Sequence, residues 1–145
     1  MADKTVRTFN PAQIIITFGA IIMSGFADGT FLTITGNGDR FEKRRGADGT
    51  IDRINKNNFD YEVVLTLMQT SITNKNLSII MQADQLSNAG ILPLTIKDLN
   101  GDTLFFAPQA WIAKDPDDEF GDSLGNREWK FQTGMAEKLT GGNVG

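Results

Sequence analysis

The side chains that could do chemistry in this 145-residue chain are concentrated in one acidic segment, because the sequence contains no His and no Cys. The segment runs from Asp115 to Asp122 and carries five carboxylates with no Lys or Arg among them. Without His the usual general base and the commonest metal ligand are missing. Without Cys there are no disulfides, thiolate nucleophiles or thiolate metal sites. Ser-His-Asp, Cys-His and zinc-hydrolase chemistries are therefore excluded.

Two carboxylate chemistries can be weighed against a merely solvated acidic loop. Calcium prefers several carboxylate oxygens on a flexible loop. The spacing fits an EF-hand poorly, since Phe120 follows Glu119 where Gly is needed and Asn126-Arg127 occupies the closing stretch. Paired carboxylates for glycoside hydrolysis have little support, because sugar clefts usually need aromatic platforms. The polar-edged aromatic residues are only Trp111, Trp129 and Tyr61. We predict no catalytic, metal or cofactor site, and a solvated loop or interface patch instead.

A basic cluster lies near the middle of the chain and is interspersed with acids, notably Glu42 and Asp52. The net charge of −4 argues against binding of nucleic-acid backbones, which requires phosphates to be neutralised by Lys and Arg. The basic cluster and the acidic segment form a complementary pair for head-to-tail self-association. Two unrelated solvated loops explain the charges equally well at this stage. The candidate inter-subunit contacts are Arg40, Lys43, Arg44, Arg45, Arg53, Asp115, Asp117, Asp118, Glu119 and Asp122.

Short strands and tight turns must position these segments. Gln13–Phe18 and Ala20–Met23 are β-branched runs around a Gly, which predicts a hairpin. Asp48-Gly49 is a favoured pair for a primed turn and predicts the tip of a second hairpin. In 59–70, Tyr61, Val63, Leu65 and Leu67 alternate with other residues, which predicts a long strand with one apolar side. Further strands are expected at Thr30–Thr35, Ile91–Leu99, Asp102–Ala107, Gln109–Ala113 and Arg127–Thr133.

Helical spacing occurs once, where Leu77, Ile80 and Met81 follow the possible caps Ser71, Thr73 and Asn74, and Gly90 provides a stop. The fold class is therefore mainly β: a β-sandwich or partly closed barrel with one flanking α-helix. We expect one domain over 1–145, with a projecting hairpin around 37–58 and a flexible Gly-rich C-terminal tail at 134–145. No apolar run is long enough to span a bilayer.

Several short motifs in series resemble a family of tail tube proteins from contractile-tailed bacteriophages. The similarity runs from about Phe9 to about Thr133. The motifs that carry it are Gly25–Gly29, Gly46–Gly49, Leu67–Ser71, Lys97–Gly101, Gln109–Ile112, Glu119–Gly121 and Gly125–Trp129. The resemblance implies a non-enzymatic structural subunit with a tail-tube or secretion-tube-like fold. It also implies stacked hexameric rings whose inner strands join into one barrel.

The same resemblance implies a location in the virion, in the phage tail, after synthesis in the host cytoplasm. The implied partners are other copies of the chain, the tail sheath protein, the tape-measure protein, and baseplate and tail-terminator proteins. Genomic DNA would pass through a negatively lined conduit without specific binding, because an acidic wall repels phosphates. Two alternatives stay open: a monomeric ligand-binding β-sandwich module of a baseplate, and a related secretion-tube subunit.

Overall fold

Ten strands, one α-helix and one short 3-10 helix form the regular structure of the computed structural model, which describes residues 6, 9–99 and 101–141. The chain is mainly β, as predicted. The helices are η1 (Pro11–Gln13) and α1 (Thr73–Ser87). The strands are β1 (Ile14–Phe18), β2 (Ile21–Ile22), β3 (Leu32–Gly36), β4 (Phe41–Arg45), β5 (Ile51–Asn55), β6 (Tyr61–Met68), β7 (Leu92–Asp98), β8 (Leu104–Lys114), β9 (Asn126–Thr133) and β10 (Glu137–Leu139).

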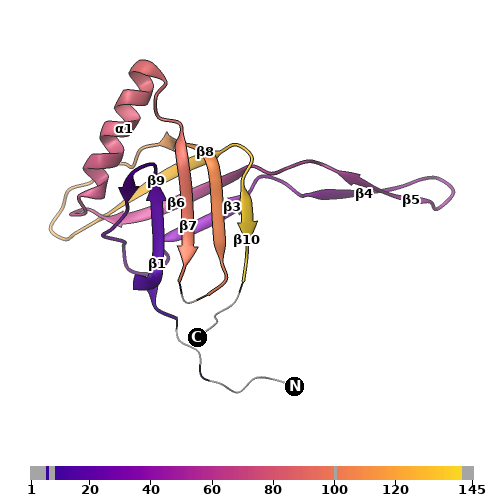
Figure 1. Ribbon diagram of the computed structural model, residues 1–145, viewed down its shortest axis with the longest axis horizontal. Coiled ribbons are helices and arrows are strands. Elements are labelled where there is room, and N and C mark those ends of the chain that lie inside the picture. Colours follow the sequence, from indigo (N-terminus) through magenta and orange to yellow (C-terminus); the bar gives the residue numbers. More distant parts are fainter. Residues whose placement is uncertain (1–5, 7–8, 100, 142–145) are drawn as a thin grey trace.

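Eight strands belong to one antiparallel sheet that folds over into two layers. The strand order is β2-β1-β7-β8-β9-β6-β3, and β10 pairs with the first part of β8. Figure 1 shows β1, β7, β8 and β10 running side by side, while β9, β6 and β3 cross behind them at a steep angle. The first group is called the front layer here and the second group the back layer. This arrangement is the predicted sandwich, with the helix at its flank.

β8 belongs to both layers, and Pro108 lies where it changes from one to the other. The register with β7 shifts between the pairs Leu94↔Ala107 and Leu92↔Ala110. Past this bulge β8 pairs with β9 in the back layer. Proline has no N–H to donate to a ladder and is tolerated at a bulge, and strands that switch sheets make the corners of orthogonal sandwiches. The expected two strands, Asp102–Ala107 and Gln109–Ala113, are thus one bent strand.

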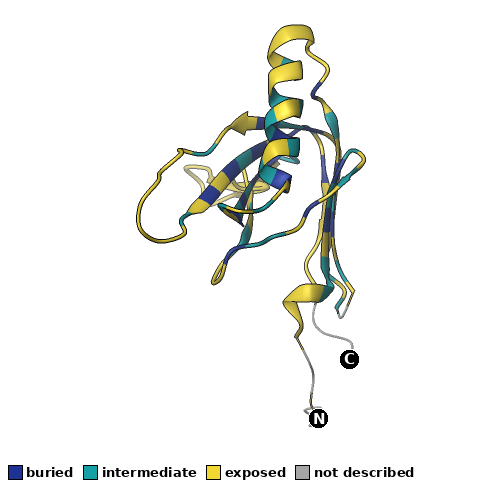
Figure 2. Cartoon of the chain, turned by 90° about the vertical axis from the view of Figure 1, so that its left-hand side faces the viewer, coloured by how far each residue is buried: buried dark blue, intermediate teal, exposed yellow. Residues whose placement is uncertain are grey.

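The core lies between the layers, and aromatic pairs connect them. Phe18 of β1 meets Phe131 of β9 edge to face, with ring centroids 5.2 Å apart. Tyr61 of β6 meets Phe105 of β8 in the same way at 5.3 Å. The predicted alternation in 59–70 is confirmed, because the apolar series that starts at Tyr61 is buried. Figure 2 shows these buried residues as bands along the strands.

α1 closes one side of the sandwich and is held there by its first turn. Leu77 is fully buried. The Trp129 Nε1–H donates to Asn74 Oδ1 over 2.9 Å, which ties α1 to β9. The N-cap residue is Ile72, which makes no side-chain cap. Of the three expected caps, Ser71 Oγ accepts the Thr73 N–H at 3.3 Å, whereas the side chains of Thr73 and Asn74 bond to Ser24 and Trp129. The helix ends at Ser87, and the residue that caps it is the left-handed Asn88, with a φ of 57°, two residues before the expected Gly90.

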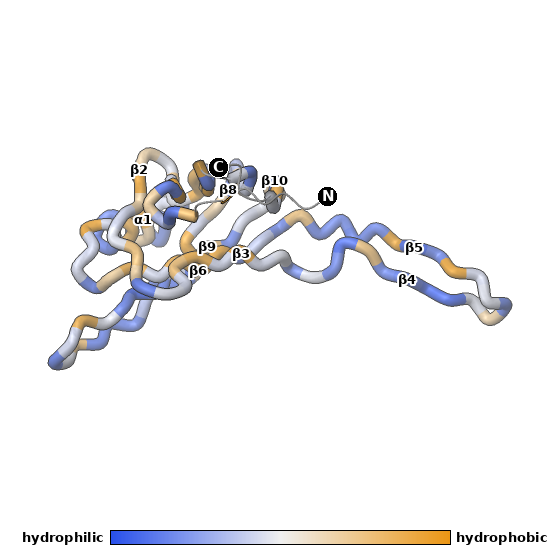
Figure 3. The backbone as a smooth tube through the Cα atoms, turned by 90° about the horizontal axis from the view of Figure 1, so that it is seen from below, coloured by the Kyte–Doolittle hydropathy of each residue, from blue (hydrophilic) through white to orange (hydrophobic). Residues whose placement is uncertain are grey.

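β4 and β5 form a separate two-stranded sheet that extends far from the sandwich. This hairpin, residues 41–55, is called the arm. Its strand residues are all exposed, and Figure 3 shows a largely hydrophilic arm with isolated hydrophobic positions. Gly49, with φ 88°, lies in the turn as the Asp-Gly pair predicted.

The expected flexible tail is wrong for its first part, because Glu137–Leu139 forms β10 on the edge of β8. Ala136 is buried, and its N–H donates to the Phe59 carbonyl oxygen over 2.9 Å. Backbone pairing of this kind was not evident from a Gly-rich composition. Residues 142–145 lie outside the described part. Among the described residues, α1 does not have the length and apolarity that a membrane crossing requires.

Candidate functional site

The arm carries four of the five basic residues predicted as inter-subunit contacts: Lys43, Arg44, Arg45 and Arg53. β4 and β5 pair in register through Phe41↔Asn55, Lys43↔Arg53 and Arg45↔Ile51. Nothing in the described part of the same chain packs over these strands, since every strand residue is exposed. The arm therefore holds its charges where a separate molecule can reach them.

The fifth basic candidate, Arg40, lies at the root of the arm and contacts the body of the same chain. Its Nη2 donates to the Tyr61 hydroxyl oxygen. Its guanidinium also lies over the Phe59 and Tyr61 rings, 5.6 Å and 5.7 Å from their centroids. Arg40 thus connects the root of the arm to the sandwich, and its contact with another subunit stays a prediction.

The turn at the arm tip is stabilised by Asp48. Its Oδ1 accepts the Thr50 N–H over 3.0 Å. This backbone hydrogen bond, and a second one from the Thr50 side chain, lower the pKa of Asp48 below its ordinary value of 3.8. The Gly46 N–H also donates to the Thr50 carbonyl oxygen over 2.7 Å. A tightly bonded tip keeps the register of the whole arm.

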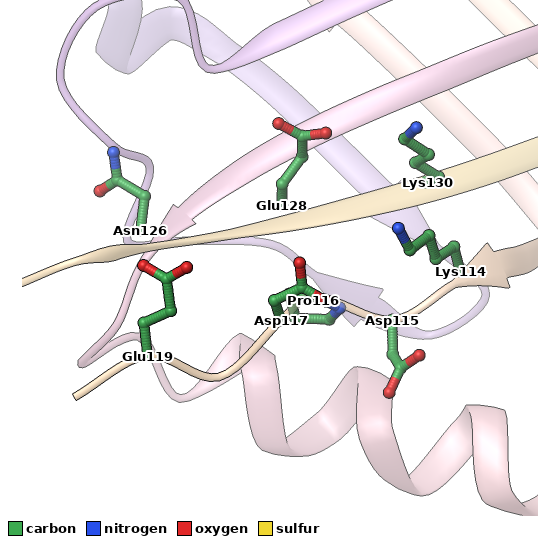
Figure 4. Close-up of a pocket in the computed structure, with 8 residues that line it drawn as sticks. All are labelled: Lys114, Asp115, Pro116, Asp117, Glu119, Asn126, Glu128 and Lys130. Carbon is green, nitrogen blue, oxygen red and sulfur yellow. The ribbon is translucent and has the colours of Figure 1, made fainter.

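The five acidic candidates lie in the acidic loop, residues 115–122, between β8 and β9. Figure 1 shows this loop at the end of the molecule opposite the arm. A groove between the loop and β9 is lined by charges of both signs, and Figure 4 shows Glu119 and Asn126 at one end of it and Lys114 and Lys130 at the other. The fold therefore does not bring the two predicted clusters together within one chain.

A buried arginine that the sequence analysis did not single out anchors the loop. Arg127 of β9 is 5% exposed, and its Nε lies 3.1 Å from Asp118 Oδ1. Its Nη2 donates to the Glu119 carbonyl oxygen over 3.2 Å, and its guanidinium lies 5.4 Å from the Phe120 centroid. The sequence signal that could have identified it is the alternation along the strand. Arg127 has the same spacing as the apolar residues Trp129 and Phe131, so it falls on the buried side, where an arginine needs a partner.

The calcium alternative finds no support in this geometry. Among the residues that the structure describes, no three carboxylates converge closely enough to hold a metal ion. Asp118 already pairs with Arg127, whereas Figure 4 shows the Asp115 carboxylate directed toward the helix. The loop is an acidic surface that is anchored by one buried cation, Arg127.

Comparison with known proteins gives one sequence relative and several structural neighbours. No protein-family model matches the chain. "Structural protein ORF10" of Pseudomonas phage KPP10 is 28% identical over 151 aligned residues, which cover 99% of this chain and 87% of that protein. The chain is thus similar along its whole length to a structural protein of a phage.

The structural neighbours share the fold at low sequence identity. The tube-terminating cap of the anti-feeding prophage superposes with a TM-score of 0.65, 14% identity and 96% coverage of both chains. A chain from the sheath/tube terminator of an extracellular contractile injection system superposes with a TM-score of 0.63 and 12% identity, and the match covers 93% of this chain and 99% of that one. A chain from the sheath–tube complex of such a system superposes with a TM-score of 0.63 and 12% identity, and the match covers 91% of each chain. These likenesses agree with the predicted tail-tube-like fold.

Proposed function

We propose that this protein is a structural subunit of a contractile phage tail, which assembles with other copies of itself into rings around a conduit. Support comes from the similarity to a phage structural protein and from a fold shared with cap, terminator and sheath–tube components. The described residues carry no arrangement that calls for catalysis, so the role we propose is structural.

The observation that carries the proposal is a pair of open strand edges in the back layer. β3 ends the strand order and pairs with β6 alone. At the other side of this layer, within the described residues, β8 over Trp111–Lys114 pairs with β9 alone. Unpaired strand edges invite pairing with another chain, and closure into a barrel removes them. We infer that β3 of one copy joins the end of β8 of the next.

The direction of the strands permits this joint to be repeated. The back layer of one chain contributes four strands, β3, β6, β9 and the end of β8, and each pairs antiparallel with the next. Because four is even, β3 of one copy meets β8 of its neighbour antiparallel at every junction. A ring of any copy number therefore closes without a mismatched pair, and six copies is the number we propose from the family resemblance.

The outward side of the back layer would then form the wall of the conduit. Outward positions alternate with buried Val63 and Phe131, and most of them are hydroxyl, amide or apolar residues. The charged ones on the four strands are Glu62, Glu128, Lys130 and Lys114, the last of which pairs with Lys130. The strands therefore add no net charge to the wall, and the negative lining that we propose would come from the acidic loop beside β9. A wall lined in this way repels phosphates, so a polyanion such as DNA can slide along it.

Sheath, tape-measure, baseplate and tail-terminator proteins are the partners that this role requires. The ring surface outside the conduit would face a sheath, and the ring ends would face the baseplate or a terminator. DNA would be a passing cargo. These partners are proposed from the assembly and not from individual contacts.

A terminator or cap is the second candidate, because two of the structural neighbours are terminating components. The two roles differ in stacking. A tube subunit forms rings that stack into long hollow tubes, whereas a terminator forms single rings that add only to a tube end. A secretion-tube subunit would also stack, and the surrounding genes would identify it.

Negative-stain electron microscopy of the purified protein, together with light scattering, tests the proposal. Hollow tubes support the tube subunit and isolated rings support the terminator. A monomer at every concentration and salt condition would refute ring assembly, and would favour the binding-module alternative.

A further inference from the structure

The register of the arm separates its side chains into two faces of different charge. Directly opposed residues of an antiparallel pair share a face. Lys43 pairs with Arg53, and Arg45 pairs with Ile51, so three cations lie on one face with no carboxylate from β4 or β5. This is called the cationic face, and its members are Phe41, Lys43, Arg45, Ile51, Arg53 and Asn55.

The opposite face of the arm is charge-balanced. Glu42 pairs with Ile54 and Arg44 pairs with Asp52. Glu42 Oε2 also forms an ion pair of 3.0 Å with Lys56 Nζ. The positive charges on this side have negative charges beside them in the same chain. The cationic face has no carboxylate from β4 or β5 to balance its positive charges.

The cationic face also exposes apolar surface that a solvated arm would not need. Phe41 is 47% exposed and Ile51 is 54% exposed. The Arg53 guanidinium lies 4.4 Å from the centroid of the Phe41 ring, so the charge and the ring are held side by side on the same face. A surface of cations interleaved with apolar groups is complementary to an acidic surface that also carries apolar groups, and it favours binding to such a surface.

The acidic loop of this chain has that composition, and its geometry singles out four of its five carboxylates. Asp118 is engaged by buried Arg127, which leaves Asp115, Asp117, Glu119 and Asp122. Phe120 is 81% exposed beside them. The loop is anchored by Arg127 through Asp118 and the Glu119 carbonyl oxygen, and just beyond the loop the Gly125 N–H donates to Gln69 Oε1 over 3.0 Å. An anchored surface loses little entropy when it is bound.

We propose that the cationic face of the arm docks onto the acidic loop of a second copy of this chain, through Lys43, Arg45 and Arg53 and not through Arg44. The inference rests on the proposed self-assembly and names the surfaces that carry it. The arm and the loop lie at opposite ends of the molecule, so the contact is heterologous and extends from copy to copy.

The first test compares two neighbouring charges of the arm. Arg45→Gln and Arg44→Gln remove the same charge from adjacent positions on opposite faces, so long-range effects of net charge cancel. We expect Arg45→Gln to raise the concentration at which assembly begins by about tenfold, which corresponds to ~1.4 kcal/mol per contact. Arg44→Gln should change it less than about threefold. Equal effects of the two variants, measured by sedimentation at low salt, would overturn the assignment of the face.

The second test identifies the occupant by exchanging charges. One variant carries Lys43→Glu with Arg45→Glu, and the other carries Asp117→Lys with Glu119→Lys. We expect each variant alone to stay unassembled, and an equimolar mixture to assemble with the two alternating, since reversed arms then meet reversed loops. Circular dichroism confirms that each variant is folded. Folded variants whose mixture stays unassembled would refute the loop as the occupant, whereas a wild-type protein that never assembles would refute the proposed function itself.

Discussion

Asn74 allows the attachment of the helix to the sandwich to be measured. Its Oδ1 accepts the Trp129 indole N–H at 2.9 Å, and its Nδ2 donates to the Met68 carbonyl oxygen at 3.0 Å. One side chain therefore joins the start of α1, the middle of β9 and the end of β6. Trp129 is 1% exposed with Asn74 in place, so shortening Asn74 removes the protein partner of a largely buried N–H.

We expect Asn74→Ala to lower the free energy of unfolding by about 2–3 kcal/mol. A buried donor left without a partner costs about 1–3 kcal/mol, and the lost bond to Met68 adds about 1 kcal/mol. The better helix propensity of Ala returns about 0.5 kcal/mol. With a urea m-value of about 1–3 kcal/mol/M, the unfolding midpoint falls by about 0.7–3 M.

The assay is urea unfolding followed by circular dichroism, in salt that keeps the protein dissociated. Gln82→Ala, on the exposed side of the same helix, is the control and should shift stability by less than about 0.5 kcal/mol. Trp129→Phe combined with Asn74→Ala completes a double-mutant cycle, in which we expect a coupling of about 1–2 kcal/mol. A coupling near zero would mean that this bond does not hold the helix.

Three further predictions concern the loop, the arm tip and the core. Arg127→Met should free the acidic loop from Asp118, so limited proteolysis should cut near that loop several-fold faster than in the wild type, and unchanged cleavage would contradict the anchoring role. Because the folded-state pKa of Asp48 is lowered, its stabilisation of the tip is present above the ordinary value of 3.8 and is lost as pH falls through the lowered pKa. NMR should therefore show the Thr50 amide unchanged between pH 5 and 8 and shifting only in acid, and a shift near neutral pH would contradict this. Phe131→Ala should cost about 3–5 kcal/mol in urea unfolding, because it opens a cavity between the layers, and a loss below about 1 kcal/mol would contradict the packing.

The local elements of this protein could be predicted from the amino-acid sequence, because their causes are local. Alternation from Tyr61 to Leu67 is enough to identify a strand with a buried side, and Asp48-Gly49 is enough to identify a turn. The spacing around Leu77 likewise identified α1. The order of strands and turns, and with it the mainly β class, followed from these signals.

Only the tertiary structure decided which local elements combine. β8 continues through Pro108 because a register shift against β7 removes the need for the missing N–H, and β10 exists because β8 offers it an edge. The sequence shows a run of bases in the arm, but their division between two faces depends on which residues of β4 and β5 oppose each other. Arg127 could be identified as the anchor of the acidic loop only once β9 turned it inward toward Asp118. Pairing partners, burial and register are set by contacts between residues far apart in the chain, and local propensity carries no information about them.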